Sequence, residues 1–108
     1  MIRCVHLSTG SDGRSHVEEI TLPSGLVQDA SVLHFEETAA GSALDWHTAP
    51  LRQYVITLSG TLEFTTRDGE TFVLRPGDVL RADDTTGTGH RWRLIDDQPW
   101  RRLYVELR

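Results

Sequence analysis

Cysteine is almost absent from this chain of 108 residues and lysine is entirely absent, and each absence excludes certain kinds of site. It has one cysteine, Cys4, so an internal disulfide or a cysteine-based zinc site cannot form within one chain. It has no lysine, and all eleven basic residues are arginine. Schiff-base catalysis through lysine is therefore excluded, as is a phosphate-binding loop of the Walker type, which needs a lysine.

Positive net charge and long apolar runs are lacking as well. The formal net charge is −5, whereas a nucleic-acid-binding domain needs a basic face, so we expect no nucleic-acid partner. No apolar run approaches the roughly 20 residues of a membrane span, so no membrane partner is expected. The first residues show no apolar stretch followed by a small-residue cleavage site. Together with the free thiol, this predicts a cytoplasmic location.

Sustained helical periodicity is missing, and apolar residues recur instead at every second position, as in β-strands. Leu62 and Phe64 share one face of their segment, for example. The segment that starts at Tyr54 reads YVITL and is rich in β-branched and aromatic residues, which predicts a strand buried on both faces. Strands are expected over residues 31–36, 54–58, 61–65, 71–74, 79–81 and 103–107, and from His90 onward.

Turn signals separate these segments. Asp68-Gly69 lies between two alternating runs and predicts a hairpin. Residues 75–78 (RPGD) have proline and glycine placed for a tight turn, and residues 83–89 (DDTTGTG) read as a polar loop. Short, evenly spaced strands predict an all-β sandwich or barrel.

The length fits one domain. Residues 31–108 carry the clear strand pattern and are expected to form the barrel itself. Residues 1–30 are expected to add an N-terminal strand and a surface segment around Gly10 to Gly13.

Three polar residues fall where strand geometry can bring them together. His47 lies just before the YVITL strand, Gln53 begins it, and His90 follows the glycine-rich loop. Alternation puts Gln53 and Val55 on one face of their strand, and His90 and Trp92 on one face of theirs. Both faces can look into the same barrel.

Their spacing resembles the first sequence motif of the cupin superfamily, G-x5-H-x-H-x3-E-x6-G. Gly41 is followed by His47 and Gly60 at the motif spacing, with Ala49 at the second histidine position and Gln53 at the glutamate position. The second motif, roughly G-x5-P-x-G-x2-H, is similar to Gly69, residues 76–78 (PGD) and His90, with a longer loop before the histidine. The resemblance covers roughly residues 32–107. It extends to the strings HTAPLRQ and DTTGTGH, which look like those of small single-domain bacterial cupins.

This resemblance implies an RmlC-like jelly-roll β-barrel with a ligand cavity at its mouth. Metal-binding cupins usually offer three histidines and one glutamate, whereas this chain keeps only His47, His90 and the amide of Gln53. A divalent ion prefers anionic or deprotonated ligands. A tightly held catalytic iron or zinc is therefore not expected. A divalent metal (Zn, Ni, Cu, Fe or Mn) held weakly by these three residues remains open, the first three of these metals favouring imidazole.

Other residues have two interpretations each. His34 and Glu36 can supply missing ligands if they point inward, but Leu33 and Phe35 compete for that face, and apolar residues usually take it. Gln53 can instead be a core amide that hydrogen-bonds an opposite strand. For the remaining polar and aromatic candidates the ordinary interpretation is preferred: Asp83 and Asp84 as solvated loop charges, Trp46 and Trp92 as filling for the core or barrel mouth, and Arg52 as an outward-facing ion-pairing residue.

Two functions follow from this pocket. One is a small-molecule-binding module. The alternative is a metal-assisted or metal-free enzyme (a lyase, isomerase, cyclase or oxygenase) acting on a small organic substrate. In it, His47 and His90 are the catalytic residues, since histidine titrates near neutral pH.

A homodimer is expected as well. The outward face of the central strand carries Tyr54, Ile56 and Leu58, which a monomer would leave in water. Dimers are also common among cupins.

Overall fold

The computed structural model describes all residues from Met1 to Arg108 and contains strands but no helix. Accordingly, no helical segment is available that could cross a membrane. The strands in chain order are β1 (Ile2–Thr9), β2 (Ser15–Leu22), β3 (Ala30–Thr38), β4 (Ala43–His47), β5 (Gln53–Ser59), β6 (Leu62–Thr66), β7 (Thr71–Leu74), β8 (Val79–Ala82), β9 (His90–Leu94) and β10 (Trp100–Leu107). The prediction of an all-β chain is confirmed.

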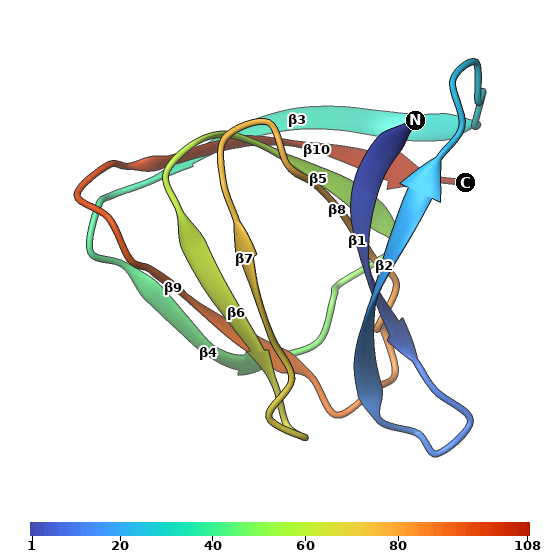
Figure 1. Ribbon diagram of the computed structural model, residues 1–108, viewed down its shortest axis with the longest axis horizontal. Coiled ribbons are helices and arrows are strands. Elements are labelled where there is room, and N and C mark those ends of the chain that lie inside the picture. Colours follow the sequence, from blue (N-terminus) through green and yellow to red (C-terminus); the bar gives the residue numbers. More distant parts are fainter.

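The strands form two sheets that face each other (Figure 1). One sheet has six strands in the order β2-β1-β8-β5-β10-β3, and the other has four in the order β4-β9-β6-β7. All neighbouring strands are antiparallel except β1 and β8, which are parallel. Because β4 and β9 belong to one sheet and β5 and β10 to the other, the motif residues approach the space between the sheets from both sides.

The first thirty residues contribute more to the barrel than the sequence predicts. They form two strands rather than one, β1 and β2, joined by a short turn at Gly10–Gly13. β1 also pairs with β8, which places the N-terminal hairpin beside the central strands. The pattern of β2 is weak in the sequence because only Ser15, a polar residue, is fully buried in it, and its other residues are half-buried or exposed.

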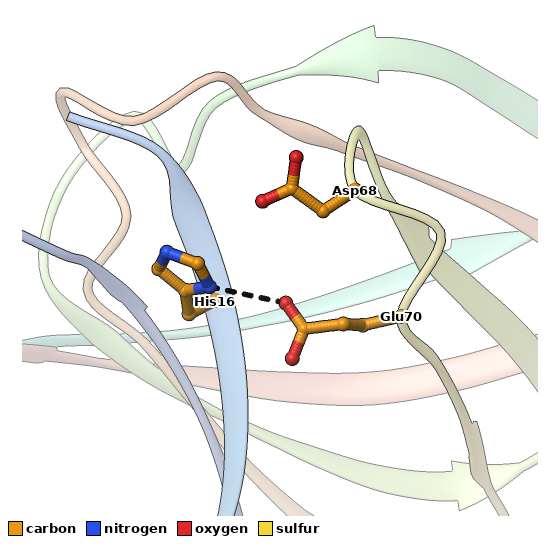
Figure 2. A group of neighbouring side chains, drawn as sticks. All are labelled: His16, Asp68 and Glu70. Atoms are coloured by element: carbon orange, nitrogen blue, oxygen red, sulfur yellow. Dashed lines mark hydrogen bonds and ion pairs between the residues drawn. The ribbon is translucent and has the colours of Figure 1, made fainter. Parts of the chain in front are cut away.

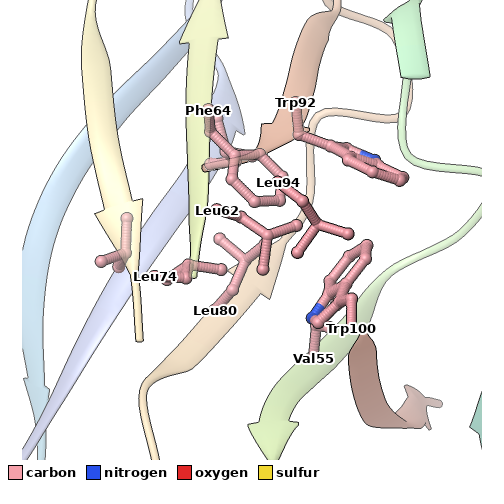
Figure 3. Close-up of a cluster of buried hydrophobic side chains, with 10 residues drawn as sticks. Val55, Leu62, Phe64, Leu74, Leu80, Trp92, Leu94 and Trp100 are labelled. Carbon is pink, nitrogen blue, oxygen red and sulfur yellow. The ribbon is translucent and has the colours of Figure 1, made fainter. Parts of the chain in front are cut away.

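The hydrophobic core fills the space between the sheets (Figure 3). Trp92 of β9 and Trp100 of β10 meet edge to face with ring centroids 4.8 Å apart, so each sheet contributes one indole. The Trp100 indole N–H donates a hydrogen bond to the Thr57 hydroxyl at 3.2 Å. Aromatic pairs of this kind add about 0.5–1.5 kcal/mol beyond the burial of their surface. This rigid layer forms the floor of the cavity described next.

Candidate functional site

A cavity of about 530 Å³ opens between the two sheets above the core. The indoles of Trp92 and Trp100 and the ring of Phe64 line its apolar side. Its polar side is lined by His34, Glu36, Thr38, His47, Gln53, His90, Arg102 and Tyr104. Its volume lies within the range of about 300–1,000 Å³ that is usual for small-molecule sites.

The structure brings His47 and His90 together in this cavity. They are register partners at the paired ends of β4 and β9. Their ring centroids lie 4.4 Å apart, with an interplanar angle of 62°. Gln53, at the start of β5 in the opposite sheet, lines the same cavity and is 7% exposed. All three sequence-predicted site residues therefore share one space, and Gln53 makes no side-chain hydrogen bond to an opposite strand.

A buried carboxylate orients His90. Nδ1 of His90 lies 2.7 Å from Oδ2 of Asp84, and the Ser15 hydroxyl donates to the same oxygen at 3.0 Å. The backbone N–H of Gly89 donates in turn to the Ser15 hydroxyl at 2.9 Å, which ties the loop before β9 to the start of β2. Burial alone would raise the pKa of Asp84, but the hydrogen bond and charge of His90, helped by Ser15, outweigh it and hold that pKa below its ordinary value.

The interpretation of Asp84 as a solvated loop charge was therefore wrong. Its side chain is fully buried, and its Oδ1 atom has no hydrogen-bond partner. Neighbouring Asp83 is not freely solvated either: its side chain is 13% exposed and pairs with His6, Arg81 and Arg52. The sequence around Asp83 and Asp84 does not indicate which of them is buried, because the partners of Asp84 come from β2 and β9.

His47 is held by the backbone instead. Its Nδ1 atom lies 2.7 Å from the carbonyl oxygen of Asp45. Burial lowers the pKa of His47, and nearby His90 lowers it further, against the opposing effect of the Asp45 carbonyl. The ring is therefore neutral at pH 7. Because a carbonyl oxygen can only accept, Nδ1 carries the proton, and Nε2 is left as a lone-pair acceptor.

His34 and Glu36 line the cavity as well, contrary to the preference for apolar residues on the inner face of β3. Leu33 and Phe35 take the outer face, where they are 57% and 69% exposed. The inner face of β3 borders the open, polar end of the barrel rather than the packed core, so it has no need of apolar side chains. His34 stacks on Tyr104 of β10, with ring centroids 4.7 Å apart.

A second cluster of ligand-type side chains lies outside the cavity. His16, Asp68 and Glu70 place ligand atoms within 4.8 Å of one another (Figure 2). Arg14 pairs with Asp68, and Asp12 lies 2.8 Å from Nε2 of His16. These partners lower the pKa of Asp68 and raise that of His16, as expected for ion pairs at the surface.

The donors in the cavity fit only part of the metal centre that the cupin resemblance implies. His47 and His90 both use Nδ1 for a hydrogen bond, an arrangement typical of metal-binding histidines, whose other ring nitrogen binds the ion. The single acidic group beside them, Asp84, is taken by His90 and Ser15. His47 and His90 are not part of any group of three histidine, cysteine or carboxylate side chains whose ligand atoms all lie within 4.8 Å of one another. The residues therefore do not fit a tightly held, four-ligand metal.

Comparison with known proteins gives the fold and the family. The Cupin_2 model of the cupin domain matches residues 32–106. A DUF861-family protein from Thermotoga maritima is 27% identical, covering 68% of this chain and 77% of its own, with a TM-score of 0.57.

Two further structures support the fold. The cupin domain of Cnp3 from Schizosaccharomyces pombe is 20% identical, covers 98% of this chain and 82% of its own, and has a TM-score of 0.58. A cupin domain from Bordetella pertussis is 17% identical, covers 78% and 88%, and has a TM-score of 0.56. No curated protein matches the chain. With a family model spanning most of its length and a jelly roll of two facing sheets, this chain belongs to the cupin family.

Proposed function

We propose that this cupin binds a small organic molecule in the cavity between its sheets, with His47, Gln53 and His90 as polar contacts. The observation that carries the proposal is the cavity of about 530 Å³, which is lined by the indoles of Trp92 and Trp100 and by the oriented imidazoles of His47 and His90. Apolar walls with a few convergent polar groups are the usual composition of such sites.

A second function, catalysis on the same molecule, is favoured by the buried Asp84–His90 pair. A carboxylate that accepts from Nδ1 fixes the orientation of the imidazole and leaves Nε2 as the ring nitrogen that can exchange a proton with a ligand. Neutral His47, 4.4 Å away between ring centroids, can accept a hydrogen bond from the same ligand. In the metal-assisted form of this hypothesis, His47, Gln53 and His90 hold a divalent metal weakly.

Ligand binding is tested with the full chain and a library of small organic molecules, followed by ligand-observed NMR. Molecules that bind the cavity are expected to lose at least about 10-fold in affinity in His47→Ala and His90→Ala, because each variant removes a polar contact worth about 1.4 kcal/mol or more. His16→Ala is the matched control, since His16 lies outside the cavity. A library without binders, or binders indifferent to both cavity variants, would refute the proposal.

The same variants decide the metal question. Titration of metal-free protein with Zn²⁺ is expected to show weak binding that His47→Ala and His90→Ala each abolish. If His16→Ala alone abolishes it, the ion sits at the surface cluster of His16, Asp68 and Glu70 instead.

We propose further that two copies of the chain associate through the outer face of the six-stranded sheet. Tyr54 is not part of the exposed surface, because its side chain is 8% exposed and its hydroxyl bonds Gln28. The apolar outer face keeps half-buried Ile56 and exposed Leu58 of β5. It also includes Leu33 and Phe35 of β3 and Leu103 and Val105 of β10. β3 also ends the sheet, so its free edge can pair with a second copy.

Phe35→Asp is expected to convert the dimer to a monomer. A charge in the centre of an apolar interface removes a well-buried anchor, with an expected cost of about 2 kcal/mol or more and so at least about a 30-fold weaker association. Light scattering during size-exclusion chromatography measures the mass. Ile95→Asp, at an exposed apolar residue on the β9–β10 loop, should leave the dimer intact. A wild-type chain that is monomeric at high concentration would contradict the proposal.

A further inference from the structure

One buried charge in the cavity is not explained by the histidine pair. Arg102 of β10 is 6% exposed and is the only arginine among the buried residues. Its side chain lines the cavity. The register of β10 against β5 shifts between Arg101 and Arg102, a bulge of the kind that often redirects a side chain beside a functional site.

The protein holds this guanidinium by neutral groups. Nη1 donates to the Thr38 hydroxyl at 2.7 Å and to the Trp100 carbonyl at 3.1 Å. Nε donates to the Tyr104 hydroxyl at 3.1 Å. The guanidinium carbon lies 3.9 Å from the centroid of the Trp100 ring and 5.5 Å from that of Tyr104. The head group is thus fixed in position, with Nη2 free of any protein partner.

A carboxylate partner is missing. Arg102 forms no ion pair, whereas Arg101, the residue before it, pairs with Glu37 on the outside of the sheet at 3.1 Å. Glu36 is the register partner of Arg102 on β3, but its carboxylate is about half exposed and lies 3.7 Å from His34 instead. A buried cation without a counter-ion is costly, and stacking on aromatic rings offsets only part of that cost.

We infer that Arg102 binds a carboxylate group of the ligand, so that the cavity accepts small organic acids that carry one negative charge. This rests on the proposed ligand-binding function. Nη2 keeps its two N–H donors, and a charge-assisted hydrogen bond from a guanidinium N–H to a carboxylate oxygen is stronger than one between neutral groups. One charge is favoured over the two of a phosphate because Arg102 is the only arginine in the cavity wall and lysine is absent from the chain.

The inferred acid lies across the cavity in a defined direction. Arg102 and Tyr104 belong to the six-stranded sheet, whereas His47 and His90 belong to the four-stranded sheet. A molecule whose carboxylate contacts Arg102 therefore directs its other end toward the two imidazoles. The indole of Trp100, beneath the guanidinium, would contact the carbon skeleton between them and report binding through its fluorescence.

The test compares monocarboxylic acids with their uncharged primary amides, using benzoate against benzamide and pyruvate against pyruvamide. Affinities come from tryptophan fluorescence and ligand-observed NMR. For wild-type protein, at least one acid is expected to bind 10-fold or more tightly than its amide. Arg102→Gln should reduce that ratio to near one, and Arg102→Lys should keep part of it. Glu36→Gln should leave acid binding unchanged or strengthen it, since it removes a negative charge from the cavity wall.

The outcomes separate this inference from the function on which it rests. Acids and amides that bind equally well, with binding that His90→Ala weakens, overturn the carboxylate inference and leave the ligand-binding function standing. A panel that does not bind at all overturns the inference. If Arg102→Gln does not fold, the acid-to-amide ratio of the wild type and of Glu36→Gln still decides the question.

Discussion

Asp84→Ala is expected to lower the free energy of unfolding by about 2–6 kcal/mol, because it leaves two buried donors unpaired at about 1–3 kcal/mol each. The Asp84 carboxylate is fully buried and accepts from Nδ1 of His90 at 2.7 Å and from the Ser15 hydroxyl at 3.0 Å. Without it, two donors are left unpaired in the interior, and the ring of His90 loses its orienting contact. Urea denaturation measures the stability.

The pH dependence of stability provides an independent readout for Asp84. The pKa of Asp84 lies below its ordinary value of 3.8 in the folded protein. Its ionised form therefore stabilises the fold in full above pH 3.8, and this stabilisation is lost as the pH falls through the lower, folded-state value. Across about pH 2 to pH 6, the unfolding free energy of Asp84→Ala should thus fall less steeply with acid than that of the wild type.

The neighbouring carboxylate supplies the matched control. Asp83→Ala removes an acidic residue from the same loop, but one that is partly exposed and whose partners His6, Arg81 and Arg52 all keep some contact with solvent. We expect a smaller loss than for Asp84→Ala, because water can solvate these partners once the carboxylate is gone. An equal loss of unfolding free energy in the two variants would show that the burial of Asp84 does not increase its contribution to stability.

Gly89→Ala is expected to disrupt both the fold and the histidine pair. Gly89 has φ of +90°, and a Cβ atom there would lie 2.7 Å from the carbonyl oxygen of His47. The positive φ alone costs a non-glycine residue about 1–3 kcal/mol. The contact adds to this, because a strand backbone on β4 cannot move aside without displacing His47. Loss of stability in urea, together with changed ¹⁵N–¹H signals of His47 and His90, measures the effect.

Gly69→Ala separates the cost of a positive φ from the cost of the close contact with the His47 carbonyl. Gly69 has φ of +84° in the β6–β7 turn, but nothing lies within 4 Å of its added Cβ atom. The variant therefore carries only the conformational cost. Gly89→Ala should lose more stability than Gly69→Ala and should alone weaken ligand binding. If the two variants behave alike, the close approach between Gly89 and His47 is not important.

Much of the architecture could be read from local patterns. Period-two alternation marked the strands at Leu62 and Phe64, and Asp68-Gly69 marked the hairpin between β6 and β7. β4 and the second N-terminal strand were not predicted from the sequence, because β4 is short and β2 buries no apolar residue fully.

The candidate site, like the fold, was only partly predictable from the sequence. His47, Gln53 and His90 could be selected because, at motif spacing, His47 precedes a predicted strand, Gln53 begins it and His90 follows a predicted loop, although their roles remain proposals. Asp84, Ser15 and Arg102 carried no signal. Ser15 and Asp84 are 69 positions apart and meet only through the folded chain. Arg102 lies in a charged stretch, WRRLY, in which nothing indicates that one arginine is buried and the other is not.

The amino-acid order by itself determined that this protein is built of short strands with two histidines and a glutamine near strand ends, since turn chemistry and side-chain alternation act over a few residues. Only the tertiary structure decided which face of each strand is the inner one. It turned His34 and Arg102 into the cavity and Leu33 and Phe35 toward solvent. Alternation defines two faces of a strand, but the interior is the face that another sheet covers, and that depends on packing between distant segments.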